Sequence, residues 1–97
     1  MMDFKQWDDM VRILFNRKNK TLFSLLKKRN IIGLLDHNYK VYCKKNNIIL
    51  DEKVEMRELV KNILFDMNFD QRRVKTMQIE ELMELMVGFN KRGIFFS

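Results

Sequence analysis

The sequence contains no proline, one cysteine, one histidine and three glycines among its 97 residues. Because a disulfide needs two cysteines, Cys43 cannot form one within the chain, and we expect a reducing intracellular compartment, cytoplasmic or nuclear. No apolar run approaches the roughly 20 residues that a membrane-spanning helix needs. The first seven residues also lack the basic stretch and apolar run of a signal peptide. We therefore predict a protein that is neither secreted nor bound to a membrane.

The chemically reactive side chains do not form a catalytic or metal-binding pattern. His37 and Cys43 offer two metal ligands, whereas a structural zinc site uses four. The three glycines stand apart, so the sequence has no glycine-rich phosphate loop. A catalytic triad would have to combine His37 with Ser24 or Cys43, and nothing in the sequence supports that geometry. The sequence thus predicts a protein that is not an enzyme and that uses no cofactor and no metal.

Positive charge is concentrated in one part of the chain. The net charge is +6, yet residues 17–45 hold nine basic side chains against Asp36 alone, while the segments on either side are each slightly acidic. Mutual repulsion within such a cluster costs stability, and a bound polyanion removes that cost. Clustered charge is a footprint of nucleic-acid binding, although a solvated basic face kept for solubility gives the same pattern.

Apolar residues recur at spacings of three and four in several segments, which is the period of an amphipathic helix. The first expected helix covers residues 4–16, with Asp3 as its cap and Gln6 as the partner in a capping box. The second covers residues 21–29 and is capped by Thr21. With a hydrophobic fraction of 46%, the chain has the composition of a folded protein, and we expect one domain over residues 1–97.

Two further helices are expected in the second half of the chain. One covers residues 52–67, with Asp51 as its cap. The other runs from Thr76, its expected cap, to Asn90, and Gly93 is placed to end it.

The middle of the chain has a different pattern. Residues 31–35 are apolar and fit either a short helix or a turn followed by a buried strand. Residues 36–38 read as a turn. Beyond them Tyr39, Val41 and Cys43 alternate with more polar neighbours, which is the period of a strand. These features predict a β-hairpin over residues 39–50.

The expected fold is therefore mainly α, a small domain of four to five helices with a β-hairpin at residues 39–50. Two helices, a short apolar element, a basic hairpin and a further helix over about residues 4–67 resemble the order of elements in a winged helix. That resemblance implies a recognition helix in the DNA major groove and a wing on the backbone. Because residues 31–35 are poor in base-reading side chains, residues 21–29 are the better basic candidate for recognition.

We predict a non-enzymatic nucleic-acid-binding protein, a DNA-binding accessory protein or transcription regulator, with RNA as an open alternative. Cations contact phosphates, and a tyrosine on the hairpin can stack or donate a hydrogen bond. The alternative for the hairpin lysines is protection of a sheet edge. The predicted nucleic-acid contacts are Arg17, Lys18, Lys20, Lys27, Lys28, Arg29, Lys40, Tyr42, Lys44 and Lys45.

The alternative function is a protein–protein interaction module, such as a viral, phage or plasmid protein that binds a host or partner protein. We expect the eight methionines to pack in the core, and the alternative is that they line an adaptable groove for a partner. The apolar residues after Gly93 should be tied down, either in a homodimer or against the chain's own core near Trp7. The predicted partner surface consists of Met83, Met86, Phe89, Ile94, Phe95 and Phe96.

Overall fold

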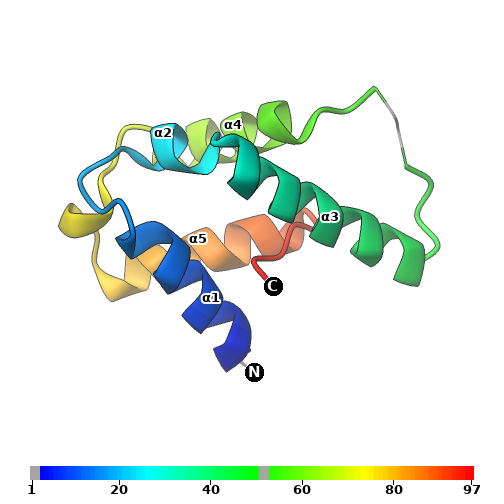
Figure 1. The fold of residues 1–97 in the computed structure, drawn as a ribbon, viewed down its shortest axis with the longest axis horizontal. Coiled ribbons are helices and arrows are strands. Elements are labelled where there is room, and N and C mark those ends of the chain that lie inside the picture. The colour runs from blue at the N-terminus through cyan, green and yellow to red at the C-terminus, as the bar shows by residue number, and fades with distance from the viewer. Residues whose placement is uncertain (1–2, 51–52) are drawn as a thin grey trace.

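This computed structural model describes residues 3–50 and 53–97, which contain five α-helices and one short 3-10 helix joined by connectors (Figure 1). No strand occurs among these residues, so the mainly α fold with five helices is confirmed. None of the described helices is long and apolar enough to cross a bilayer. The elements are α1 (Phe4–Phe15), α2 (Leu22–Leu26), α3 (Arg29–Lys45), α4 (Met56–Met67), η1 (Val74–Thr76) and α5 (Ile79–Lys91).

The first two helices begin where the sequence predicts. The Asp3 side chain accepts a hydrogen bond from the Gln6 backbone N–H at 3.2 Å, and Thr21 accepts one from the Ser24 N–H at 3.2 Å. These side chains satisfy amides that have no partner inside the helix. The predicted second helix is nevertheless too long, because α2 ends at Leu26 and a new helix starts at Arg29.

The last helix differs from its prediction at one end. Thr76 belongs to η1 and does not cap α5. Instead the Gln78 backbone N–H donates to Glu81 Oε1 at 3.0 Å at the start of α5. The helix ends at Lys91, and Gly93 follows with a φ of +81°, as the position of this glycine predicts.

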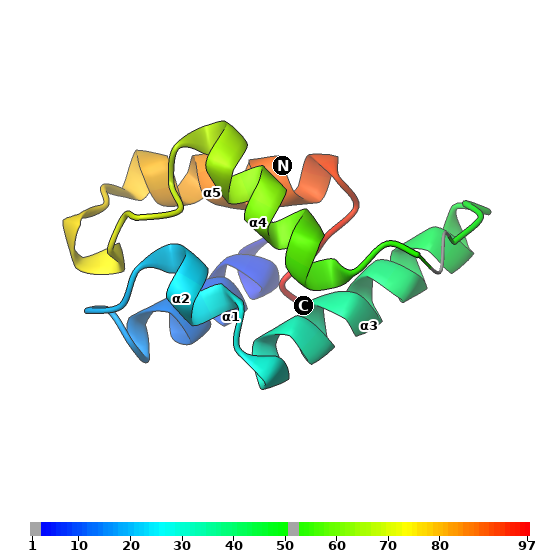
Figure 2. The same ribbon diagram turned by 90° about the horizontal axis from the view of Figure 1, so that it is seen from above.

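Helix α4 is central to the packing, since it contacts α2, α3 and α5, while α1 contacts η1. Figure 2 shows α4 lying between α5 and α3 when the molecule is seen from above. The core draws apolar side chains from all five helices and from the C-terminal tail. Among its fully buried members are Met10, Leu14, Leu22, Leu26, Leu35, Val60, Leu64, Leu85, Phe89 and Ile94.

The predicted β-hairpin is wrong. Residues 36–45 continue α3, and residues 48–50 form no strand. Leu35, Tyr39 and Cys43 are spaced four apart and line one side of the helix, where Leu35 and Cys43 are buried. Over so short a stretch, the alternating pattern of a strand and the four-residue spacing of a helix overlap.

Without a hairpin there is no wing, so the resemblance to a winged helix is also wrong. The apolar residues 31–35 belong to the first half of α3 and are not a separate element. The predicted start of the next helix at Asp51 and Glu52 lies outside the described residues; α4 itself begins at Met56 and ends at Met67.

The C-terminal tail packs within its own chain. Ile94 is fully buried and Phe96 is 1% exposed, and the Phe96 ring centroid lies 5.2 Å from that of Phe89. The Asn38 side chain donates to the Phe95 carbonyl at 2.9 Å. Of the two alternatives for the tail, the structure has the one in which the tail is tied down by its own core.

Candidate nucleic-acid interface

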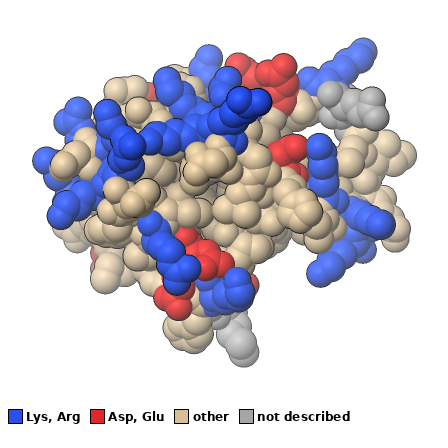
Figure 3. All heavy atoms as spheres, viewed as in Figure 1, with Lys and Arg blue, Asp and Glu red and all other residues tan. Residues whose placement is uncertain are grey.

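Helix α3 divides the basic segment into two groups. Lys27, Lys28 and Arg29 lie at its N-terminal end, and Lys44 and Lys45 lie in its last turn. A helix of 17 residues is roughly 25 Å long. Figure 3 accordingly shows one gathering of Lys and Arg side chains over the left part of the molecule and another at its far right. The sequence places these charges in one segment, but the structure does not bring them to one site.

At the left-hand group, the connector after α1 runs beside the residues that lead into η1. The Lys75 backbone N–H donates to the Lys18 carbonyl at 3.3 Å, and Thr21 forms an isolated antiparallel bridge with Arg73. Arg73 and Lys75 are both exposed. Two cations from outside the predicted segment therefore join its N-terminal group.

A third addition comes from α4. The Arg57 guanidinium donates to the Lys27 carbonyl at 3.3 Å, which holds the arginine beside the junction of α2 and α3. Since α2 has five residues and rises roughly 7.5 Å, the cations at its two ends lie near one another, and we group them as one candidate surface. We call this surface the basic end. It consists of Arg17, Lys18, Lys20, Lys27, Lys28, Arg29, Arg57, Arg73 and Lys75.

Sequence reasoning missed Arg57, Arg73 and Lys75 because each lies far along the chain from residues 17–29. Arg73 and Lys75 stand out in the polar connector at residues 68–75, yet nothing local indicates which helix that connector passes. Only the tertiary contacts of Lys18, Thr21 and Lys27 assign them.

Arg72 has a different role from its neighbours. Its guanidinium forms two hydrogen bonds to the Glu81 carboxylate, one of them 3.0 Å long, and one more to the Thr76 carbonyl at 3.1 Å. Hydrogen bonding to Glu81 raises the pKa of Arg72. The Arg72 guanidinium, together with the Gln78 backbone N–H, lowers the pKa of Glu81. This bidentate pair fixes the connector onto α5, and its charge is compensated internally.

The C-terminal half of α3 has fewer cations available to a ligand than the basic end. Lys40 Nζ lies 2.9 Å from an oxygen of Asp36, one turn earlier. The Tyr42 ring lies against the tail, with its centroid 5.3 Å from that of Phe95. Tyr42 is therefore not on a hairpin beside free lysines. Lys44 and Lys45 are exposed.

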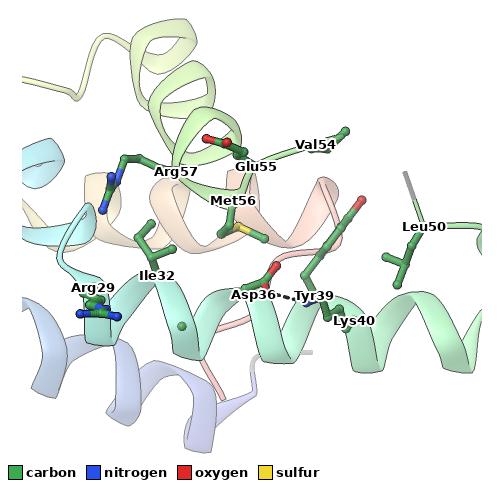
Figure 4. Close-up of a pocket in the computed structure, with 11 residues that line it drawn as sticks. Arg29, Ile32, Asp36, Tyr39, Lys40, Leu50, Val54, Glu55, Met56 and Arg57 are labelled. Carbon is green, nitrogen blue, oxygen red and sulfur yellow. Dashed lines mark ion pairs between the residues drawn. The ribbon is translucent and has the colours of Figure 1, made fainter. Parts of the chain in front are cut away.

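A groove of about 630 Å³ lies between α3 and the segment that leads into the first turn of α4. Figure 4 shows Ile32 and Met56 pointing into it from its opposite walls. Its charged lining consists of Arg29, Arg57, Glu55 and the Asp36–Lys40 ion pair. Within residues 3–50 and 53–97, no three His, Cys, Asp or Glu side chains gather as metal ligands do. The basic end is therefore our candidate for a functional surface.

Most of the predicted partner surface is inside the protein. Met86, Phe89, Ile94 and Phe96 are at most 6% exposed, so they pack in the core of this chain. Met83 is 38% exposed and borders a shallow groove with Met67 and Val87. Phe95 is half-buried against Tyr42.

This all-α domain matches the C-terminal helical domain of dimethyladenosine transferases. The crystal structure of a dimethyladenosine transferase from Plasmodium falciparum superimposes with a TM-score of 0.94 and 29% sequence identity. The match covers 99% of this chain and 34% of that one. No family model matches the chain.

Individual relatives agree with this match. The chain is 34% identical over 96 residues to a probable dimethyladenosine transferase of Drosophila melanogaster, covering 99% of this chain and 31% of the relative. It is 30% identical over 94 residues to the dimethyladenosine transferase of Schizosaccharomyces pombe, covering 97% of this chain and 31% of the relative. The chain thus spans about a third of the length of the curated relatives that it matches.

These relatives overturn the predicted function. The chain is homologous to part of an enzyme, so the predictions of a non-enzymatic protein and of a DNA-binding transcription regulator are wrong. The alternative of a viral, phage or plasmid interaction module is wrong for the same reason. The 97 residues correspond to about a third of each transferase, so their side chains alone do not indicate whether the matched proteins are enzymes.

Proposed function

We propose that this chain acts as the helical domain of a dimethyladenosine transferase whose substrate is ribosomal RNA, and that its basic end holds that RNA. The observation that carries the proposal is the similarity over nearly the whole chain, at 34% identity to the Drosophila relative and a TM-score of 0.94 to the Plasmodium structure. At this level of identity the similarity supports a shared role as well as a shared fold.

The name of the reaction favours RNA as the nucleic acid. Adenosine is a ribonucleoside, so an enzyme that makes dimethyladenosine within a polymer acts on RNA. A folded RNA is a polyanion that proteins recognise largely through its phosphates and its shape. The basic end supplies nine cations from four parts of the chain, which suits a surface that follows a folded backbone. An RNA substrate also fits the predicted intracellular location.

The contribution we assign to this domain is positioning. Phosphate contacts fix the register and orientation of a nucleic acid, and correct placement of a substrate supplies a large part of the rate of many enzymes. Loss of the basic end should therefore lower the yield of methylated RNA even where the methyl-transfer chemistry is intact.

A chimera tests this proposal. The segment of the S. pombe dimethyladenosine transferase that aligns with this chain would be replaced by the chain itself. The dimethyladenosine content of ribosomal RNA would then be measured by mass spectrometry in cells that rely on the chimera. We expect dimethyladenosine to be restored by the chimera and reduced in its Lys27→Ala/Lys28→Ala/Arg57→Ala variant. A folded, expressed chimera that yields no dimethyladenosine would contradict the proposal.

A further inference from the structure

Two phenylalanines from different helices meet on the surface beside the basic end. Phe23 of α2 and Phe65 of α4 have ring centroids 6.3 Å apart and planes tilted by 45°. Phe23 is half-buried and packs against the core. Phe65 is 46% exposed, so a large part of its surface is open to a ligand.

A lysine ammonium group lies over each of the two rings. Lys27 Nζ lies 5.3 Å from the centroid of Phe23, and Lys61 Nζ lies 5.8 Å from that of Phe65. Both distances fall within the range of a cation–π contact. On α4, Arg57, Lys61 and Phe65 are spaced four apart, so they form one row along the helix.

A hollow lies where this row meets α2. It has a volume of about 590 Å³ and is lined by Phe23, Ser24, Lys27, Lys28 and Arg57. Glu58 adjoins Arg57 along α4, and Asp70 lies beside α2, where its backbone carbonyl accepts a hydrogen bond from the Phe23 N–H. Its carboxylate accepts a hydrogen bond from the Gln71 side chain. The hollow itself is lined by cations, a hydroxyl and one ring, a combination that favours an anionic ligand with a flat apolar part.

A nucleotide has this chemistry. Every base presents an aromatic face, and base–aromatic stacking combined with cations along the backbone is how proteins bind single-stranded nucleic acid. A base within a duplex cannot use such a surface, because both of its faces are already stacked on neighbouring pairs. Unpaired nucleotides in RNA loops and ends are free to be splayed onto a protein ring.

We propose that the surface formed by Phe23, Lys27, Arg57, Lys61 and Phe65 binds an unpaired nucleotide of the RNA substrate. The base stacks on the exposed Phe65, which lies beside the hollow in contact with its ring Phe23, and the flanking phosphates contact Lys27 and Arg57 of the hollow and the neighbouring Lys61. This inference rests on the proposed function, since it names the part of the RNA that the basic end holds.

Two RNA hairpins test the inference, and in both the loop is replaced by a flexible polyethylene-glycol linker that carries no base. One has a blunt end, and the other has the same stem with three unpaired nucleotides, one of them the fluorescent base 2-aminopurine. The affinity of the full chain for each is measured by anisotropy. Because stacking of one base contributes a factor of roughly 5 to 100 to affinity, we expect the second hairpin to bind more tightly by that factor. Stacking on Phe65 should also quench the 2-aminopurine.

Phe65→Leu removes the aromatic face while keeping an apolar side chain of similar packing. It should reduce the preference by the stacking factor and abolish the quenching, with the slope of log affinity against log salt unchanged. Lys27→Ala/Lys61→Ala should instead reduce that slope, by about 0.7 for each single-strand phosphate released. The matched control is Phe15→Leu, since Phe15 is exposed to nearly the same extent, 45%, on α1; it should retain both signals.

The outcomes separate the two proposals. Equal affinity of the wild-type chain for both hairpins, or an undiminished preference in Phe65→Leu with unchanged circular dichroism, would overturn this inference and leave RNA binding intact. Failure of the wild-type chain to bind either hairpin at low salt would overturn the proposed function as well.

Discussion

Gln6 and Asn90 exchange two side-chain hydrogen bonds across the core. Gln6 Nε2 donates to Asn90 Oδ1 at 3.1 Å, and Asn90 Nδ2 donates to Gln6 Oε1 at 2.8 Å. Gln6 Oε1 also accepts from the Phe96 backbone N–H at 3.1 Å, and Asn90 Nδ2 also donates to the Ile94 carbonyl at 3.1 Å. This pair of amides therefore joins α1, α5 and the C-terminal tail at one point.

Replacing Gln6 should cost much more stability than its modest size indicates. Gln6 is 2% exposed, and Gln6→Ala leaves Asn90 Oδ1 and the Phe96 N–H without the partners that Gln6 supplies. Each unsatisfied buried group costs about 1–3 kcal/mol, so we expect a loss of about 2–4 kcal/mol in the free energy of unfolding, measured by urea denaturation. Gln71→Ala, on the surface, should change it by less than about 0.5 kcal/mol. Equal effects of the two substitutions would show that the Gln6–Asn90 hydrogen bonds do not contribute to the free energy of unfolding.

Two glycines should respond to alanine with opposite signs. Gly93 has a φ of +81°, and a Cβ there would lie 2.6 Å from the Tyr42 ring. The left-handed conformation alone costs an alanine about 1–2 kcal/mol, so Gly93→Ala should lower stability by at least that amount. Gly33, inside α3, has open space around it, and Gly33→Ala should raise stability by about 0.5–1 kcal/mol. Thermal unfolding of both variants checks the prediction, which fails if the two shifts have the same sign.

The Arg72–Glu81 pair makes stability depend on acid pH. Because the Arg72 guanidinium lowers the pKa of Glu81 in the folded protein from its ordinary value of 4.5, the ionised carboxylate stabilises the fold above that pH. This contribution falls as the pH drops through the lowered pKa. The stability difference between wild type and Glu81→Gln should be full at pH 7 and shrink in acid. Denaturant titrations at several pH values measure it; a difference that is constant from pH 7 to pH 3 would contradict this linkage.

Local sequence patterns predicted the parts of the fold that local interactions determine. The caps at Asp3 and Thr21, the stop at Gly93 and the end of α4 follow from nearest neighbours in the chain. The pattern failed at α3, since an alternation over Tyr39, Val41 and Cys43 is too short to distinguish a strand from a helix that packs on a core.

Only part of the candidate site, the basic end, could be predicted from the sequence, because tertiary contacts assemble the rest. Charge clustering along the chain picks out Lys27 and its neighbours, but Arg57 and Arg73 join them only through tertiary contacts. The same clustering included Lys44, which the length of α3 carries away from the others. Function could not follow from these residues alone, because a surface that binds a polyanion does not reveal what is done to the polyanion.

The most direct test of the account is the salt dependence of binding between the 97-residue chain and a structured ribosomal RNA fragment. Four to six phosphate contacts predict a slope of log affinity against log salt of about −3 to −5. Lys27→Ala/Lys28→Ala/Arg57→Ala should make the slope shallower by about 2 to 3 units. Lys44→Ala/Lys45→Ala/Lys91→Ala, which removes the same charge elsewhere, should leave it nearly unchanged. No binding at low salt, or equal changes in the two triple variants, would contradict an RNA-holding basic end.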